Sequence, residues 1–300
     1  MILVWGPSDD PPVEYVLAAL EDHPVDVVHL DDRELAGLRY DVVLAAAPSG
    51  WIELDGREVP LDRITGVYLR PGGAVDGHAA LAAARVLLAV ASSSAAATVV
   101  NRPASGRSNW SKPFQLGLIA AAGFAVAETL VTTDPTTAQA FLARHRRLVY
   151  KSVSGIRSIV ATLDAGDADD CERLRGVATG PVQLQRWIDG VDVRVHVVGR
   201  RWFATRVESD AADYRYARLV GADVVMAPCQ IPEEVAGRLV ALTRRLGLLV
   251  AGADLRRTPD GEWVCFEVNP SPGFTFYEDA TGQPIAAAIA DLLADGPPPA

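Results

Sequence analysis

The order of apolar and amphipathic segments predicts an α/β protein whose second half has α+β character. In the first hundred residues, short apolar runs alternate with helical patterns, which is typical of a small domain with a mostly parallel sheet. Further along, strand-like runs follow one another in a meander, as in "VQLQRWIDGVDVRVHVVGRRWFATRVES". The chain has 300 residues, 49% of them hydrophobic and 22% charged, which is enough for two or three packed lobes.

The first hundred residues are expected to form a Rossmann-like α/β domain. Its strands are predicted at "MILVWG", "VDVVHL", "YDVVLAA" and "GVYLR", with a helix from about Pro12 to His23 and a hairpin at Asp55-Gly56. No Gly-x-Gly-x-x-Gly pattern follows the first strand, so the dinucleotide-binding fingerprint is absent. A boundary is expected near "TVVNRPASGRSNWSKP", where proline, glycine, serine and asparagine interrupt the pattern.

The middle of the chain carries clear helix start and stop signals. A helix from about Lys112 to Ala122 is closed by Gly123, and Asp134 caps a second helix that has Pro135 at its first position. Two strand-like runs, "RLVYKSVSG" and "SIVATL", come next. After the meander we expect an amphipathic helix at "IPEEVAGRLVALTRRLG", a hairpin in "AGADLRRTPDGEWVCFEVNP" and a last helix over about 284–293.

The hairpin is predicted to bring three oxygen-bearing side chains together. Glu267 and Asn269 are two residues apart in a strand and share one face, while Phe266 and Val268 share the other face. Asp254 lies on the partner strand, opposite this pair. Such oxygen donors, without cysteine or histidine, suit Mg²⁺, which binds through one or two carboxylates together with substrate phosphates. The alternative is an antiparallel strand with one solvated face.

Lysine is rare in this chain. Among 28 basic residues, only Lys112 and Lys151 are lysines, so each is a candidate for a role that arginine cannot fill. The ammonium group is a compact charge that fits among phosphate oxygens. Lys151 also precedes the small turn "SVSGIRS", whose backbone N–H groups are able to bend over a phosphate. The arginine pairs Arg244-Arg245 and Arg256-Arg257 are expected on solvated edges.

Composition excludes several classes of protein. The net charge of −10 disfavours general nucleic-acid binding, which needs clustered basic charge. No apolar run reaches the roughly 18 to 20 residues of a membrane span, and the N-terminus lacks a signal-peptide pattern, so a cytoplasmic location is expected. Three widely spaced cysteines without a Cys-x-x-Cys pair argue against a disulfide framework and a thiolate metal site. The histidines show no ligand spacing.

The order of these motifs resembles that of the ATP-grasp ligases. The motifs are "NRPASGRSNWSKPFQLGLIAAAGFAVAETLVTTDP", Lys151, "QLQRWIDGVDVRVHVVG" and "GADLRRTPDGEWVCFEVNPSPG". They are closest to the branch that contains the RimK-type glutamate ligases and the peptide ligases of microviridin-type biosynthesis. The resemblance covers about 100–293 and implies an ATP-grasp fold of three lobes. These are a pre-ATP-grasp domain at 1–100, a central lobe at 101–182, and a C-terminal lobe with the metal site at 183–300.

The resemblance also implies a nucleotide site for ATP and Mg²⁺. Lys112 and Lys151 would contact the phosphates, and Asp192 would lie near the ribose. The metal ligands implied are Asp254, Glu267 and Asn269. The hinge that holds adenine would be formed by Gln185, Arg186, Trp187 and Ile188.

Two arginines are implied as catalytic residues. Arg194 would face the phosphates or the acyl phosphate, and Arg215 would act on the substrate side. Where RimK-type sequences have serine and asparagine after this arginine, Tyr216 and Ala217 stand here, so the substrate side departs from the pattern.

The activity implied is an ATP-dependent carboxylate–amine ligase that works through an acyl phosphate and releases ADP and phosphate. The substrates would be a small-molecule or peptide carboxylate, with an amino acid or peptide as the expected class, and an amine or hydroxyl acceptor. Two alternatives stay open: a ribosomal-peptide macrocyclase that forms side-chain ester or amide links, and a non-catalytic nucleotide-binding module. Retention of both lysines and of the three metal ligands favours an enzyme. Neither a nucleic acid nor a membrane is expected as a partner, and a homodimer is left open.

Overall fold

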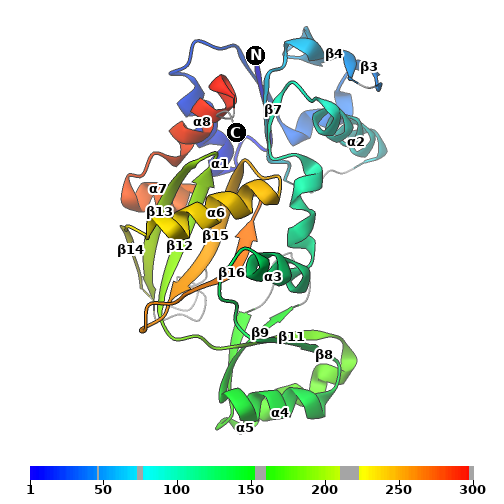
Figure 1. Cartoon of the computed structure of the whole chain (residues 1–300). Coiled ribbons are helices and arrows are strands. Elements are labelled where there is room, and N and C mark those ends of the chain that lie inside the picture. Colours follow the sequence, from blue (N-terminus) through cyan, green and yellow to red (C-terminus); the bar gives the residue numbers. More distant parts are fainter. Residues whose placement is uncertain (46, 73–76, 153–159, 210–222, 297–300) are drawn as a thin grey trace.

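The computed structural model describes residues 1–45, 47–72, 77–152, 160–209 and 223–296 of the chain. Within these ranges the strands form four sheets, which Figure 1 shows as an upper, a middle and a lower lobe. None of the helices described is both long enough and apolar enough to traverse a bilayer.

The upper lobe is built on a parallel sheet with the strand order β2–β1–β6–β7. Ile2 and Val4 on β1 belong to one core cluster, whereas Leu3 and Trp5 belong to another, so both faces of the sheet are covered. Helices α1 and α8 pack on the first face and α2 on the second. The elements are β1 (Ile2–Trp5), α1 (Pro11–Leu20), β2 (Val27–Leu30), β6 (Gly66–Leu69), α2 (His78–Ser93) and β7 (Thr98–Val100).

The segment "YDVVLAA" was predicted as part of this parallel sheet, and that prediction is wrong. It forms β3 (Tyr40–Val43), the edge of a separate antiparallel sheet with β4 (Ser49–Leu54) and β5 (Arg57–Pro60). Three of the four β3 residues are exposed, so the strand lacks the burial on both faces that a parallel sheet requires. The predicted hairpin at Asp55-Gly56 joins β4 and β5 and has positive φ at both residues, as the tight primed turns require.

The lower lobe is an antiparallel sheet with the order β10–β9–β11–β8. One face carries Leu148 and Leu184, which pack against Phe141 and Leu142 of α4; Figure 1 shows α4 and α5 on the side away from the middle lobe. Asp134 caps α4 as predicted: its carboxylate accepts hydrogen bonds from the N–H groups of Thr136 at 3.0 Å and Thr137 at 3.1 Å. The elements are β8 (Thr129–Thr132), α4 (Pro135–His145), β9 (Arg147–Ser152), β10 (Val160–Asp164), α5 (Ala168–Arg173) and β11 (Val182–Arg186).

The middle lobe is an antiparallel sheet with the order β14–β13–β12–β15–β16. Its apolar face packs against α6, which crosses the sheet in Figure 1. Helix α3 (Lys112–Ala121) precedes the lower lobe in sequence and lies against β16. The other elements are β12 (Val191–Val198), β13 (Arg201–Ser209), β14 (Val224–Pro228), α6 (Glu233–Arg245), β15 (Val250–Arg257), β16 (Trp263–Asn269) and α7 (Thr275–Thr281).

The last helix returns to the first lobe. Helix α8 (Ile285–Asp295) places Ile285, Ile289 and Leu293 in the same cluster as Ile2 and Val4. In Figure 1 it lies beside α1 in the upper lobe. The core of the first sheet therefore contains residues from both ends of the chain. The domain boundaries predicted near residues 100 and 182 stay predictions.

One side chain ties the parallel sheet to the middle lobe. Asn101 follows β7, and its amide nitrogen donates to the carbonyls of Val250 and Pro270, both at 2.6 Å. Its amide oxygen accepts from the N–H groups of Leu249 at 2.7 Å and of Val250 at 3.1 Å. Asn101 thus satisfies backbone groups at the start of β15 and just after β16.

Asn101→Ala is expected to lower the free energy of unfolding by about 2–3 kcal/mol, because it leaves backbone donors and acceptors without partners. Denaturant unfolding measures this loss. Asn101→Asp should recover part of it, since a carboxylate still accepts from the two N–H groups. The exposed residue Gln230 supplies the control: Gln230→Ala should change the unfolding free energy by less than about 0.5 kcal/mol. Equal effects of Asn101→Ala and Gln230→Ala would contradict the bridging role.

Candidate functional site

The polar face of the lower sheet carries Lys151. On β9, Lys151 stands directly opposite Gln183 of β11, with Gln185 two residues further along. The Lys151 Nζ donates to Gln185 Oε1 at 2.8 Å, and Gln185 Nε2 donates to Thr129 Oγ1 at 3.1 Å. Leu148 and Tyr150 of β9 belong to or pack against the core beneath α4, and side chains alternate along a strand, so Lys151 is on the face not covered by α4.

The strand pair β15–β16 contains the predicted metal ligands in register. Asp254 pairs with Glu267, and Gly252 pairs with Asn269, so the oxygen donors share one face of the hairpin as expected. The Asn269 Oδ1 accepts from the N–H of Ser271 at 2.9 Å. In the described part of the chain, no three or more His, Cys, Asp or Glu side chains converge on one point. Two carboxylates and an amide fit Mg²⁺, which completes its shell with water and phosphate.

The expected alternation along β16 is wrong at Phe266. The register shifts between Asp254 and Leu255: Leu255 pairs with Cys265, and Phe266 is an extra residue in a β-bulge. Cys265 and Val268 therefore lie in the core, while Phe266 joins the polar side, where its ring centroid is 5.5 Å from Lys151 Nζ. The bulge thus places an aromatic ring near the lysine, on the side that was predicted to be polar.

Arg194 lies beside the candidate metal ligands. It pairs with Asp254 across β12 and β15, and its Nη1 donates to Asp254 Oδ1 at 2.7 Å. Only 5% of the Arg194 side chain is exposed. A Cβ atom at Gly252 would lie 2.0 Å from Arg194 Nη2, so glycine is needed there to admit the guanidinium.

Behind Arg194 lies His196, which is fully buried. Its Nε2 is 3.3 Å from the carbonyl oxygen of Gly273 and 3.4 Å from Arg194 Nε. Burial, with a smaller contribution from Arg194, holds the pKa of His196 well below its usual value. A lowered pKa favours the uncharged imidazole, because burial disfavours the charged form.

Arg256 was expected on a solvated edge, and this expectation is wrong. Its Nε and Nη2 donate to the Asp192 carboxylate at 2.8 and 2.9 Å, and its Nη1 donates to the carbonyl of Ile188 at 2.7 Å. Its guanidinium carbon also lies 5.0 Å from the Trp187 ring centroid. Arg256 thus joins the predicted hinge to the predicted ribose residue. Arg257, like Arg244 and Arg245, is exposed as expected.

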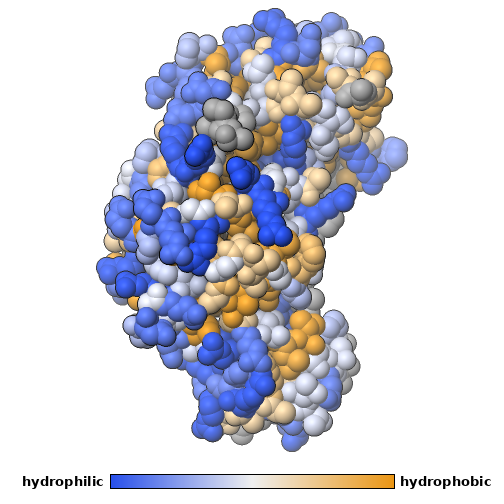
Figure 2. All heavy atoms as spheres, viewed as in Figure 1, coloured by the Kyte–Doolittle hydropathy of each residue, from blue (hydrophilic) through white to orange (hydrophobic). Residues whose placement is uncertain are grey.

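A polar pocket of about 560 Å³ opens next to the hinge. Trp187 forms part of its wall, with the guanidinium carbon of Arg147 at 4.0 Å from the ring centroid. Asp192, Arg256 and residues 207–209 of β13 line the rest, so the pocket lies between the lower and middle lobes. Figure 2 shows one face of the molecule, whose outline narrows on the right between the upper and the lower lobe.

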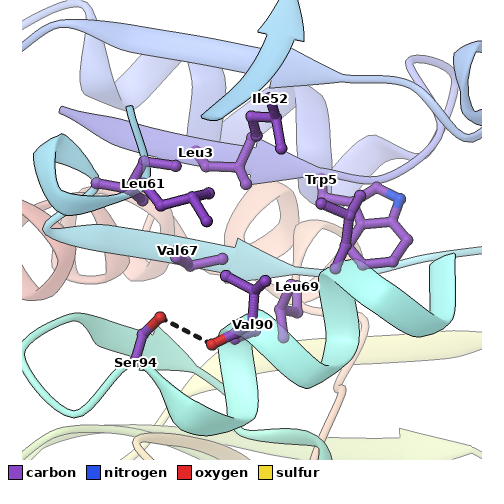
Figure 3. A pocket seen from close by; sticks show the side chains of 11 residues that line it. Leu3, Trp5, Ile52, Leu61, Val67, Leu69, Val90 and Ser94 are labelled. Atoms are coloured by element: carbon purple, nitrogen blue, oxygen red, sulfur yellow. Dashed lines mark hydrogen bonds between the residues drawn. The ribbon is translucent and has the colours of Figure 1, made fainter. Parts of the chain in front are cut away.

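A second pocket, in the upper lobe, is lined mostly by apolar side chains. Its volume is about 20 Å³, and its lining is Leu3, Trp5, Ile52, Val90 and other apolar side chains (Figure 3). The hydroxyl of Ser94, which also lines it, donates to the carbonyl of Val90 at 2.7 Å. This pocket is a small packing gap in the core of the upper lobe.

Two supports of the site were not found by sequence reasoning. Gln115 on α3 is 2% exposed and makes two hydrogen bonds to the backbone of Val268, at 2.8 and 3.0 Å. It holds β16 next to Glu267, and it lies one turn after Lys112, the first residue of α3. Arg70 pairs with Asp10 and donates to the Ser271 Oγ at 3.0 Å, which fastens the loop after β16 to the upper lobe.

Two of the predicted site features lie in parts of the chain that the structure does not describe. Arg215, with Tyr216 and Ala217, belongs to 210–222, and most of the turn "SVSGIRS" belongs to 153–159; both ranges lie outside the described residues. Arg186 is exposed on β11, and the roles predicted for the individual site residues stay predictions.

Comparison with known proteins covers the part of the chain that forms the site. The family model described as "RimK-like ATP-grasp domain" matches residues 111–293. The probable alpha-L-glutamate ligase of Xanthomonas oryzae pv. oryzae (strain MAFF 311018) is 31% identical over 186 residues, which are 59% of this chain and 61% of that protein. The chain thus matches about three fifths of the length of such curated relatives.

Solved structures resemble nearly the whole chain. The ATP-grasp ligase PsnB, complexed with a phosphomimetic variant of its minimal precursor, Mg and ADP, is 27% identical, with a TM-score of 0.80 over 98% of this chain and 97% of that one. The RiPP-associated ATP-grasp ligase of Chryseobacterium gregarium, in complex with ADP and a leader and core peptide, is 22% identical, with a TM-score of 0.83 over 99% and 97%. The predicted ATP-grasp fold is confirmed.

Arg256→Ala is expected to lower the free energy of unfolding by about 1–3 kcal/mol, because it leaves the Asp192 carboxylate and the Ile188 carbonyl without this donor. Its neighbour provides a matched control: Arg257→Ala removes the same group from an exposed position and should cost less than about 0.5 kcal/mol. Denaturant unfolding of both variants measures the difference. Similar losses for the two would show that Arg256 is no more than a surface cation.

Proposed function

Since the chain belongs to the RimK-like ATP-grasp family, we propose that it is an ATP-dependent ligase that joins a carboxylate to an amine. The observation that carries this proposal is the register of β15 with β16, which sets Asp254 opposite Glu267 beside Arg194. Carboxylates and a buried guanidinium together suit a metal-bound polyphosphate, because both signs of charge are needed around it. Membership of the family indicates ATP as the nucleotide substrate and Mg²⁺ as the ion for this site.

Each group has a role in positioning or in charge stabilisation. Asp254, Glu267 and Asn269 would hold Mg²⁺, and Lys151 would lie along the phosphates. The backbone of the hinge at 185–188 and the Phe266 ring would hold adenine. ATP supplies the phosphoryl group that turns an unreactive carboxylate into an acyl donor.

The reaction has two transfers. A carboxylate oxygen of the substrate attacks the γ-phosphorus, the bond to the bridging oxygen breaks, and ADP leaves. The amine then attacks the acyl carbon, phosphate leaves and the amine loses a proton. Arg194 would offset negative charge on the transferred group. Such steps need positioning and charge stabilisation more than a nucleophilic side chain.

We favour a peptide carboxylate as the substrate. The precursor-bound PsnB structure resembles 98% of this chain, including the upper lobe, at 27% identity and a TM-score of 0.80. Formation of ester or amide links within one peptide, as by a macrocyclase, is one form of this proposal. A non-catalytic nucleotide-binding module is the alternative. Arg215 as a substrate residue, the cytoplasmic location and the homodimer stay predictions.

Incubation with ATP, Mg²⁺ and candidate substrates should yield ADP and phosphate, because the carboxylate attacks the γ-phosphorus. Chromatography of the nucleotides measures this, and formation of AMP would contradict the acyl-phosphate route. Mass spectrometry then identifies the product. Loss of water within one peptide indicates macrocyclisation, whereas gain of an amino-acid residue indicates a glutamate-ligase type of reaction. Nucleotide binding without turnover on any carboxylate would favour the non-catalytic module.

Glu267→Ala is expected to lower kcat by about 10²- to 10³-fold, because it removes a charged group aimed at the metal and the polyphosphate. Glu262, an exposed residue just before β16, gives the control: Glu262→Ala should leave kcat unchanged. Steady-state rates at saturating ATP and Mg²⁺ measure both. A Glu267→Ala variant of normal activity would place the metal site elsewhere.

A further inference from the structure

Gln185 is almost entirely buried and is engaged at both ends of its amide. Its side chain is 1% exposed, its oxygen accepts from Lys151 Nζ at 2.8 Å, and its nitrogen donates to Thr129 Oγ1 at 3.1 Å. The Thr129 hydroxyl in turn donates to the carbonyl of Ala127 at 2.8 Å. This series of hydrogen bonds fixes which end of the Gln185 amide faces the lysine, because a flipped amide would set its NH₂ group against the ammonium.

The acceptor that Gln185 offers is uncharged. The same face of β11 also carries Gln183, which is 1% exposed and stands directly opposite Lys151. Its Oε1 has no hydrogen-bond partner in the described structure, so it leaves a second neutral acceptor in this buried patch. Both positions of β11 that face Lys151 therefore carry amides where a glutamate of the same length would fit.

We propose that Gln185 is a positioning residue that orients the Lys151 ammonium toward the nucleotide phosphates while leaving its positive charge available to them. The proposal rests on the proposed function, in which Lys151 contacts the phosphates. A carboxylate at 185 would bond to the lysine as closely, but it would also offset the charge that attracts the phosphates. At a buried site such a charge is screened much less than at the surface.

The proposal predicts an effect that depends on the phosphates of the ligand. In the proposed function, adenosine would contact the backbone of the hinge and the ribose residue, whereas ADP with Mg²⁺ would also contact the Lys151 side chain. Gln185→Glu should therefore weaken binding of Mg²⁺–ADP by about tenfold and leave adenosine binding nearly unchanged. A purely structural role for Gln185 would weaken both ligands alike.

Calorimetric titration of the full chain with Mg²⁺–ADP and with adenosine tests this. The Lys151→Ala background is the second arm: once the ammonium is absent, adding Gln185→Glu should cause little further loss of Mg²⁺–ADP affinity. Gln139 gives the matched control, since it is exposed on α4, the helix that covers the opposite face of the sheet. Gln139→Glu adds the same charge and should change neither affinity.

The outcomes separate the inference from the proposed function. If the unmodified chain does not bind Mg²⁺–ADP, the proposed function fails. If it binds, but Gln185→Glu keeps the same preference for ADP over adenosine, the inference is overturned and the function stands. Should Gln185→Glu fail to fold, as judged by circular dichroism, Gln185→Leu decides. Loss of the orienting oxygen should then lower the preference for ADP, and an unchanged preference would overturn the proposal.

Discussion

The pairing of β15 with β16 determines the geometry of the whole site. A single extra residue, Phe266, lets Leu255 pair with Cys265 while Asp254 still pairs with Glu267. Without the bulge, the alternation of side chains along a strand would put Cys265 and Glu267 on the same face. Either the thiol would leave the core or the carboxylate would enter it. The bulge resolves this conflict: the thiol stays in the core, the carboxylate faces Asp254, and the aromatic ring turns toward Lys151.

The site is assembled from strands of two sheets, and a few buried polar side chains fix their relative positions. Arg256 connects β15 to the hinge, Gln115 connects α3 to β16, and Asn101 connects the upper lobe to the start of β15. Each bonds to backbone groups, which have defined positions, so each transmits the geometry of one element to the next. Loss of one such contact would affect ligand geometry at a distance from the substitution.

Sequence patterns predicted the elements better than the contacts between them. The cap at Asp134 and the turn at Asp55-Gly56 are local, and both formed as expected. The pairing of Asp254 with Glu267 was also predictable, because a hairpin brings neighbouring strands together. The bulge at Phe266 was not, since it depends on which side chains the packed core admits. Arg256 looked like half of a surface pair, because its partners come from residues about 65 positions away. Amide groups such as Gln115 and Gln185 carry no distinctive pattern in sequence, although their burial gives them large effects.

The return of α8 to the upper lobe bears on how the chain is made. Synthesis proceeds from the N-terminus, and domains generally begin to fold as they emerge from the ribosome. Here one face of the first parallel sheet, including Ile2 and Val4, is covered in part by Ile285 and Ile289, which follow these strand residues by most of the sequence. Part of the apolar face of this sheet therefore stays uncovered until α8 has been translated. During that interval the strands and the first helix of the upper lobe are already made, and their uncovered apolar surface is of the kind that favours aggregation and chaperone binding.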